Sequence, residues 1–241
     1  MSNFWHTFFF DPVYNTLVFF VSVIPGGDVG LAIIATVLLV KMVLLPVSIK
    51  AVKTQKIMRE IEPKLKEMRE KYKDDRQQQA QEMMKIYQEA GMNPLASIFL
   101  IFLQIPIIIA LYFAVSTGGG VALPDINTDL LYAFINTPVD VTMNFIGLVD
   151  ISGRSLLLAI AAGVTQYIHV NLTLPQLPPK EACAEPNLKE DFMRNMQTQM
   201  KYVMPVIITF VAYTISAAIA LYFLVSNLTM IAQEYYIRRH R

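Results

Sequence analysis

A lysine inside an otherwise apolar run is the residue of this chain best placed to do chemistry. Lys41 lies near the centre of residues 31–49, where it is the one charged side chain. As a helix, this run rises roughly 28 Å, close to the thickness of the hydrocarbon core of a bilayer. A charge at that depth costs about 2.5–3.5 kcal/mol, so an intramembrane lysine indicates a functional site. The alternative is snorkelling, in which the side chain extends along the helix to the membrane interface.

Amide and hydroxyl side chains accompany Lys41 in the other apolar runs. We single out four of them as candidate lining of a water-filled groove around the lysine: Gln104, Gln166, Ser226 and Asn227. The same runs also hold Thr165, Asn171, Thr209 and Gln233. Taken one at a time, such residues usually hydrogen-bond a neighbouring helix, which is the alternative for each of them. A proton pump or cation transporter normally carries an embedded carboxylate, and only Glu234, at the inner end of its run, comes close to that.

The remaining motifs predict neither an enzyme nor a metal site. The three histidines, His6, His169 and His240, lie at different depths or in different compartments, so we expect no metal cluster and no cofactor. The triple glycine at 118–120 lacks the lysine and hydroxyl residue of a phosphate-binding loop. The basic block at 50–85 is nearly neutralised by its own acidic residues, which argues against direct binding of nucleic acid.

Composition and charge distribution indicate a membrane protein of several spans. Of the 241 residues, 54% are hydrophobic and 16% charged. Lysine and arginine gather in residues 50–85, 180–201 and 238–241, whereas residues 1–30 and 118–153 contain neither. Because basic loops stay in the cytoplasm, this pattern predicts an external N-terminus, a cytoplasmic C-terminus and an odd number of spans. The single cysteine, Cys183, falls in a cytoplasmic block, so no disulfide framework is expected.

The elements that must position Lys41 follow from the breaks in the pattern. Residues 1–28 predict an external helix lying in the interface, with an additional span as the alternative. Residues 29–49 form the first transmembrane helix, and 50–93 a charged cytoplasmic helical hairpin. Residues 94–241 hold four further transmembrane helices, with an external loop at 117–153 and a cytoplasmic loop at 175–200. The apolar run at 203–237 is too long for one span and has basic flanks, so we expect it to fold back near residues 214–218. The fold class is therefore an all-α polytopic membrane protein, with five transmembrane helices around a hydrophilic groove.

The hairpin has more structure than a linker needs. Apolar residues recur at helical spacing along its first half: Ile57, Ile61, Leu65, Met68 and Tyr72. Residues 73–76 interrupt this stripe, and a second, weaker stripe follows before Gly91. We interpret the block as a partner-binding element or a lid, the alternative being a simple connection between two spans.

Several motifs, taken in order along the chain, resemble those of YidC-type membrane protein insertases. They are the mid-membrane cation Lys41 with Pro46 after it, the stretch from Met83 to Tyr87, and the Gly91-Met92-Asn93-Pro94-Leu95 stop. They continue with Gln104-Ile105-Pro106-Ile107 and with the last span from Leu221 to Leu228. The resemblance implies five core helices around a groove that opens to the cytoplasm and to lipid, in a bacterial plasma membrane. It also implies nascent membrane proteins and the lipid bilayer as partners, and the Sec translocon and the signal-recognition-particle receptor as partners of the hairpin.

Three departures qualify what the resemblance implies. The groove cation of the family is usually arginine, whereas the matching residue here is Lys41, which lacks the planar fork of a guanidinium. Ser216-Ala217-Ala218 stands where many members have Pro-Ser-Gly, so we expect a looser turn. The tail ends at Arg241, without the long basic extension that some members present to ribosomes, which puts a ribosome contact in doubt.

The function expected from sequence is insertion of hydrophobic segments into the bilayer, with Lys41 attracting acidic substrate segments. A small-solute transporter or channel is the alternative, although it would need a solute site at the midplane and repeat symmetry. A passive translocon scaffold is a third possibility, in which Lys41 would be replaceable.

Overall fold

The structure is a computed structural model, which describes residues 3–73, 75–91, 95–116, 120–174 and 195–239. The chain divides into two compact units, one formed by Met1–Met42 with Pro106–Arg241 and the other by Val43–Ile105. Helices α3 (Val29–Lys71) and α5 (Leu95–Ser116) each contribute to both units. Most of the cytoplasmic loop predicted at 175–200 lies outside the described residues.

The larger unit begins with a helical segment that runs without a break from Asn3. It consists of α1 (Asn3–Trp5), the π-helical turn η1 (His6–Phe10) and α2 (Asp11–Val23). Asp11 is only the start of the regular α-helical part, since Phe10 before it already has helical dihedral angles. One face of α2 is buried in the core, through Tyr14, Leu17, Val18 and Val21. Phe8 and Phe19 remain exposed, as expected for an element at an apolar interface.

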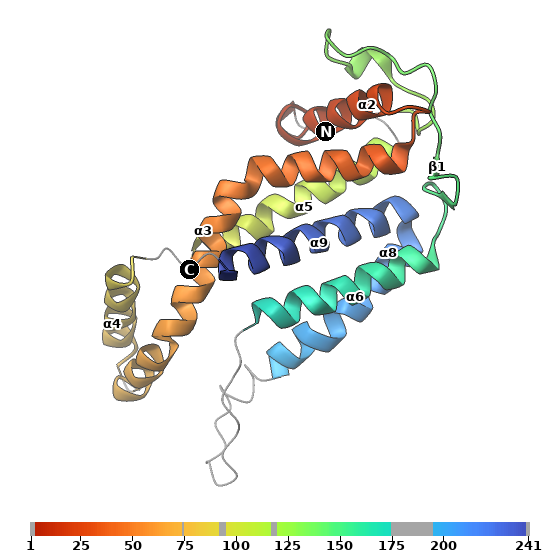
Figure 1. The fold of residues 1–241 in the computed structure, drawn as a ribbon. Coiled ribbons are helices and arrows are strands. Elements are labelled where there is room, and N and C mark those ends of the chain that lie inside the picture. Colours follow the sequence, from red (N-terminus) through yellow and green to blue (C-terminus); the bar gives the residue numbers. More distant parts are fainter. Residues whose placement is uncertain (1–2, 74, 92–94, 117–119, 175–194, 240–241) are drawn as a thin grey trace. The chain divides into compact units, whose positions relative to one another are not determined.

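Helices α6 (Leu156–Thr173), α8 (Met204–Ile215) and α9 (Ala217–Arg239) lie side by side in this unit (Figure 1). The π-helical turn η3 (Gln199–Val203) leads into α8. Gly163 lets α6 approach α8 closely, because a β-carbon at this position would collide with Thr209. Ser216, in extended conformation, is the whole connection between α8 and α9. The predicted fold-back is therefore present, and the Ser216 side chain accepts a hydrogen bond from the Ile219 amide at 3.4 Å.

The loop between α5 and α6 has short regular elements. They are the 3₁₀ turn η2 (Thr128–Leu130) and a hairpin of β1 (Asn144–Phe145) with β2 (Val149–Asp150), paired antiparallel. Sequence analysis did not predict this hairpin. Two residues per strand are too few to show the alternation by which strands are recognised.

The smaller unit contains a helical hairpin. The charged part of α3 continues the apolar part through Pro46 and Pro63, so the boundary predicted at residue 49 is not a break in the helix. Asp75 caps α4 (Arg76–Glu89) by accepting hydrogen bonds from the Gln77 and Gln78 amides, and Gln79 Nε2 donates to the Arg69 carbonyl across the turn at 2.8 Å. The predicted stripe is less exposed than its flanks, with Leu65 buried.

Three helical stretches are long and apolar enough to cross a bilayer, counting only the described part of the chain: Val29–Thr54, Leu156–Thr173 and Ala217–Ile237. A shorter apolar stretch covers Gln104–Ser116. The protein is therefore a mainly helical membrane protein with several spans.

Candidate functional site

Lys41 lines a small pocket inside the larger unit. Four helices supply the lining: Val13 from α2, Thr36, Val37, Val40 and Lys41 from α3, Ile107 and Leu111 from α5, and Tyr222 from α9. The pocket has a volume of about 10 Å³, which is the space that a single water molecule needs. The Lys41 side chain is half-buried there, among mostly apolar neighbours.

Two other polar side chains line the pocket with Lys41, and they differ in how they are satisfied. The Thr36 hydroxyl donates to the Ala32 carbonyl one turn earlier, at 2.8 Å. Tyr222 is only 2% exposed, and its hydroxyl makes no close hydrogen bond, its polar neighbour being the Ser226 side chain. The walls of the pocket are entirely apolar, so the lysine and the two hydroxyls contribute carbon atoms to its lining.

His169 on α6 does not line this pocket. Its buried Nδ1 atom has no hydrogen-bond partner among the described residues. Lys41 and Tyr222 thus bring one cation and one buried hydroxyl to the same pocket from two helices.

The four residues predicted to line the groove do not line this pocket. Ser226 and Asn227 are buried on α9, and the Asn227 amide donates to the Ala162 carbonyl at 3.3 Å and to the Thr165 hydroxyl at 3.5 Å. Asn227 therefore hydrogen-bonds α9 to α6, which is the alternative role that sequence analysis gave for these polar residues. Gln166 is half-buried on α6, and Gln104 lies in the smaller unit. A groove-lining role for these four residues stays a prediction.

Sequence reasoning gave no site role to Tyr222 or His169. A signal was available for Tyr222, which lies one helical turn before Ser226 and so shares its face of α9. His169 carries no such signal.

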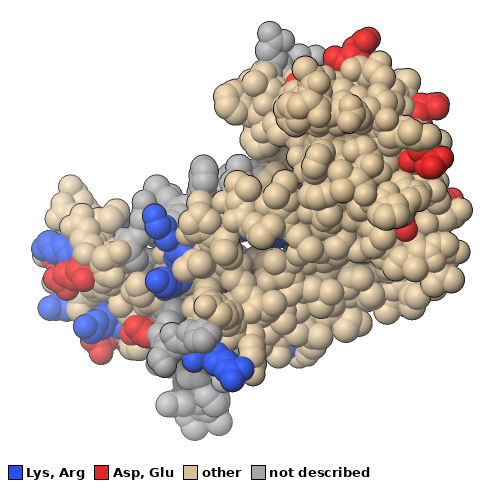
Figure 2. Space-filling model, turned by 45° about the horizontal axis from the view of Figure 1, so that its top comes forward, with Lys and Arg blue, Asp and Glu red and all other residues tan. Residues whose placement is uncertain are grey.

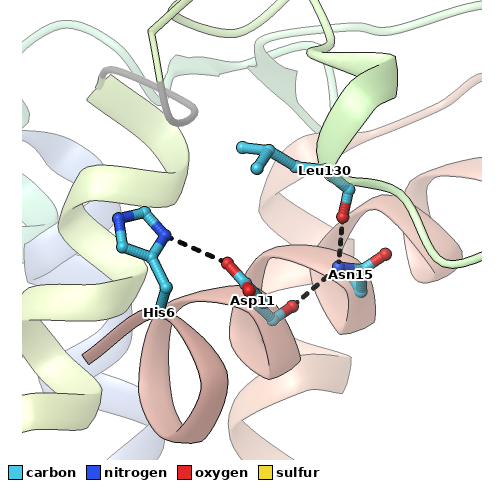
Figure 3. Close-up of polar contacts among 4 residues, drawn as sticks. All are labelled: His6, Asp11, Asn15 and Leu130. Carbon is cyan, nitrogen blue, oxygen red and sulfur yellow. Dashed lines mark hydrogen bonds and ion pairs between the residues drawn. The ribbon is translucent and has the colours of Figure 1, made fainter. Parts of the chain in front are cut away.

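A second polar cluster fixes α2, which supplies Val13 to the pocket (Figure 3). The buried Asn15 amide donates to the Asp11 carbonyl at 2.8 Å and to the Leu130 carbonyl at 2.9 Å, and Asn15 Oδ1 accepts from the Tyr132 amide at 2.7 Å. His6 Nδ1 lies 3.2 Å from Asp11 Oδ1. Asn15 therefore satisfies backbone groups of the loop between α5 and α6.

Charge is unevenly distributed over the surface. Figure 2 shows acidic side chains gathered at one end of the visible face of the larger unit, next to a broad uncharged area. The loop between α5 and α6 supplies Asp125, Asp129, Asp140 and Asp150, all exposed, and has no basic residue from 118 to 153. An uncharged belt beside a charged end is the surface expected of a protein embedded in lipid.

Comparison with known proteins identifies the family. The family model described as 60Kd inner membrane protein matches residues 19–241. Membrane protein insertase YidC 1 of Halalkalibacterium halodurans is 30% identical over 97% of this chain and 78% of its own length. Membrane protein insertase YidC of Oceanobacillus iheyensis is 32% identical over 98% of this chain and 84% of its own length. Membrane protein insertase MisCA of Bacillus subtilis is 29% identical over 98% and 80%. The chain therefore belongs to the 60Kd inner membrane protein family.

Proposed function

We propose that the protein is a membrane protein insertase, which moves hydrophobic segments of nascent membrane proteins from the cytoplasm into the bilayer. The observation that carries this proposal is the place of Lys41, a cation lining an interior pocket of a chain whose relatives named above are insertases. None of those relatives is named as a transporter, so the solute-transporter alternative gains no support from them. The proposed activity needs no covalent chemistry, and no cofactor enters it.

Lys41 would act by electrostatic attraction. An ammonium surrounded by apolar side chains attracts a carboxylate several-fold more strongly than in bulk water, because the local dielectric constant is low. The hydroxyl of Tyr222, which lines the same pocket, would supply a further hydrogen bond to the same group. The acidic outer segment of a substrate would then cross only part of the membrane, and burial of its apolar span in lipid drives the rest.

The proposed topology has five transmembrane helices, with the N-terminus outside and the C-terminus in the cytoplasm. Two observations support it: the described helices give three clear spans, and α8 returns directly into α9 through Ser216. With Leu95–Ser116 and the segment that ends in α8 as the other spans, the count is odd, as the charge distribution requires. The domain boundaries at 29–49, 50–93 and 94–241 belong to this proposal.

The charged hairpin would then lie in the cytoplasm and contact partners there. Its two legs are held by the Gln79–Arg69 hydrogen bond and by the cap at Asp75, so it presents a defined surface. The Sec translocon and the signal-recognition-particle receptor are the partners that we propose for it.

The decisive experiment is charge reversal at Lys41. We expect Lys41→Glu to reduce insertion of substrates with acidic outer segments about tenfold or more, because each 1.4 kcal/mol of lost attraction costs a factor of ten. Lys41→Arg should retain insertion, since the charge is kept. Insertion is measured by protease protection of a newly synthesised substrate in vesicles that contain the purified variant.

Two controls sharpen this test. Lys53→Glu, on the exposed surface of the same helix, should leave insertion unchanged. A substrate with a neutral outer segment should be affected much less than an acidic one by Lys41→Glu. Full insertion of the acidic substrate by Lys41→Glu would refute the proposed role of the lysine.

A further inference from the structure

The turn between β1 and β2 contains Ile146, a β-branched apolar residue that is unfavourable in a tight turn exposed to water. Ile146 has a φ of 52° and is the one non-glycine residue with positive φ in the described ranges, and Gly147 follows with a φ of 71°. The Leu148 amide donates to the Phe145 carbonyl at 2.9 Å and closes the turn. Two successive positive φ angles are typical of a type I′ turn, which favours Asn-Gly. A β-branched residue at the first position is strained, so backbone geometry does not explain Ile146.

The side chains of this turn are strongly exposed. Ile146 is 61% and Leu148 85% exposed in the protein alone. The strained conformation is held by Asp28, whose Oδ2 accepts from the Ile146 amide at 2.7 Å while its Oδ1 accepts from the Leu31 amide at 3.0 Å. Ile146 is therefore strained, is held in place by Asp28, and is exposed together with Leu148. This combination indicates that the two side chains serve to contact whatever surrounds the protein at this point.

The hairpin is fixed to the first turn of a membrane helix. Val29, the first residue of α3, donates to the Thr142 carbonyl at 3.0 Å, and the Thr142 amide donates to the Gly27 carbonyl at 2.9 Å. The Phe145 ring packs so closely on Gly30 that a β-carbon there would collide with it. The turn therefore lies beside the outer end of α3.

The hairpin is also fixed to the start of α9. The Ala217 amide donates to the Gly153 carbonyl at 2.8 Å, and the Ala218 amide to the Ile151 carbonyl at 3.2 Å. The apolar part of α9, Ala217–Ile237, has 21 residues. At 1.5 Å per residue it rises about 31 Å, so it must use its whole length to cross the hydrocarbon core. Ala217 is then at the outer edge of that core, and the hairpin lies at the membrane surface.

The charge of Asp150 limits how deeply the hairpin can enter the lipid interface. Asp150 pairs with Asn144 at the base of the hairpin, and hydrogen bonds from the Ser152 hydroxyl and amide lower the pKa of its carboxyl. The base therefore stays ionised and in contact with water. Only the apolar tip can enter the interface, at the depth of about 5–10 Å typical of interfacial elements.

We infer that Ile146 and Leu148 insert into the outer interface of the bilayer and anchor the outer ends of α3 and α9 to lipid. The occupant is the lipid itself, because the turn is continuous with the surface of helices that already lie in the membrane. Because residues 118–153 contain no lysine or arginine, the contact that the tip itself makes is apolar, and we expect it to be insensitive to salt. This anchor is independent of any substrate and goes beyond the proposed insertase activity.

The test places a fluorescent reporter at the tip of the full chain. Leu148→Trp is made in a Trp5→Phe background, because Trp5 is the only tryptophan. The protein is reconstituted in phosphatidylcholine–phosphatidylglycerol vesicles, with and without lipids brominated along the acyl chain. We expect blue-shifted emission and several-fold stronger quenching by lipids brominated near the headgroup end than by lipids brominated near the methyl end. Added salt should change neither the emission wavelength nor the quenching by brominated lipids.

A matched control is Asp129→Trp in the same background, which is exposed on η2 of the same loop. Its emission should be red-shifted and quenched by aqueous acrylamide rather than by brominated lipid. If the tryptophan of Leu148→Trp behaves in the same way, the inference is wrong. Blue emission from the tip without lipid quenching would also overturn it, since a second copy of the protein would then cover the tip.

A second variant separates anchoring from folding. Ile146→Asn suits the turn better, so the melting temperature in detergent should stay the same or rise. When Ile146→Asn is combined with Leu148→Trp, lipid quenching of the tip tryptophan should fall, because the tip loses apolar surface. A clear drop in melting temperature would show that protein contacts hold Ile146, and would refute the anchor.

Discussion

In the proposed topology, the outer end of the larger unit and its interior around Lys41 treat buried polar groups in opposite ways. At the outer end, Asn15 and Asp28 each bond backbone groups more than 100 residues away in sequence. In the interior, His169 Nδ1 has no hydrogen-bond partner within the described part of the chain, and the Tyr222 hydroxyl makes no close hydrogen bond, its polar neighbour being the Ser226 side chain. Fully satisfied polar groups specify a structure, whereas unsatisfied ones cost stability and are retained where function needs them. The polar groups of the outer end therefore stabilise the fold, whereas those of the interior are suited to binding a substrate.

The largest effect on stability is expected from Asn15→Ala. This change leaves the Leu130 carbonyl and the Tyr132 amide without their partner, so it should destabilise the protein by about 2–4 kcal/mol. Thermal unfolding in detergent measures the effect. Thr16→Ala on the same helix is the control, since its hydroxyl only bonds the Pro12 carbonyl of its own helix. Equal losses of stability in Asn15→Ala and Thr16→Ala would contradict a special role of Asn15 at the outer end.

The contact between Gly30 and Phe145 should give the next effect. Gly30→Ala forces a β-carbon into the Phe145 ring and should destabilise by about 1–3 kcal/mol, because a packed site cannot easily expand. Adding Phe145→Ala should recover part of that loss. A double-mutant cycle on unfolding midpoints measures the coupling, and strictly additive losses would contradict the contact.

Tyr222→Phe tests the interior side of the comparison. Because the hydroxyl makes no close hydrogen bond and has the Ser226 side chain as its polar neighbour, its removal should change stability by less than about 1 kcal/mol. Insertion of acidic substrates should fall several-fold, since a hydrogen-bonding group close to Lys41 is lost. Tyr235→Phe, exposed on the same helix, should alter neither quantity. A large loss of stability without a loss of insertion would make Tyr222 a structural residue.

The smallest effect is expected in the pH dependence of the melting temperature. Hydrogen bonds from Ser152 lower the pKa of Asp150, so the folded form binds its proton less readily than the unfolded chain. The stabilisation is present above the unfolded pKa of about 3.9 and is lost as the pH falls through the folded value. The drop in melting temperature between neutral pH and pH about 3 should therefore be slightly smaller in Asp150→Asn than in the parent. The difference is small because the carboxyl is exposed, and an unchanged drop would show that the turn does not depend on the charge.

Much of the helical framework could be predicted, because it depends on local signals. Helix α5 ends at Ser116, where the external loop predicted at 117–153 begins, and the fold-back predicted near residues 214–218 falls at Ser216. Length and hydropathy decide these features, and both can be read along the chain.

The rest depends on contacts between distant segments. Pro46 and Pro63 would each be expected to disturb a helix, yet α3 continues through both, since tertiary packing can outweigh a local preference. The long-range bonds of Asn15 and Asp28 have no periodicity by which they could be recognised. For the site, sequence therefore found the cation but not its neighbours.

The single residue between α8 and α9 has a consequence for how the protein itself is made. In the proposed topology, the loop at 117–153 requires several carboxylates to be carried through the membrane during synthesis. The Ser216 connection brings almost no polar material to the far side, and its hydroxyl is already used by the Ile219 amide. Two antiparallel helices joined this tightly can enter lipid together as one unit, with their backbone groups satisfied from the start. The α8–α9 pair is thus the part of the chain that needs the least help to reach its place in the membrane.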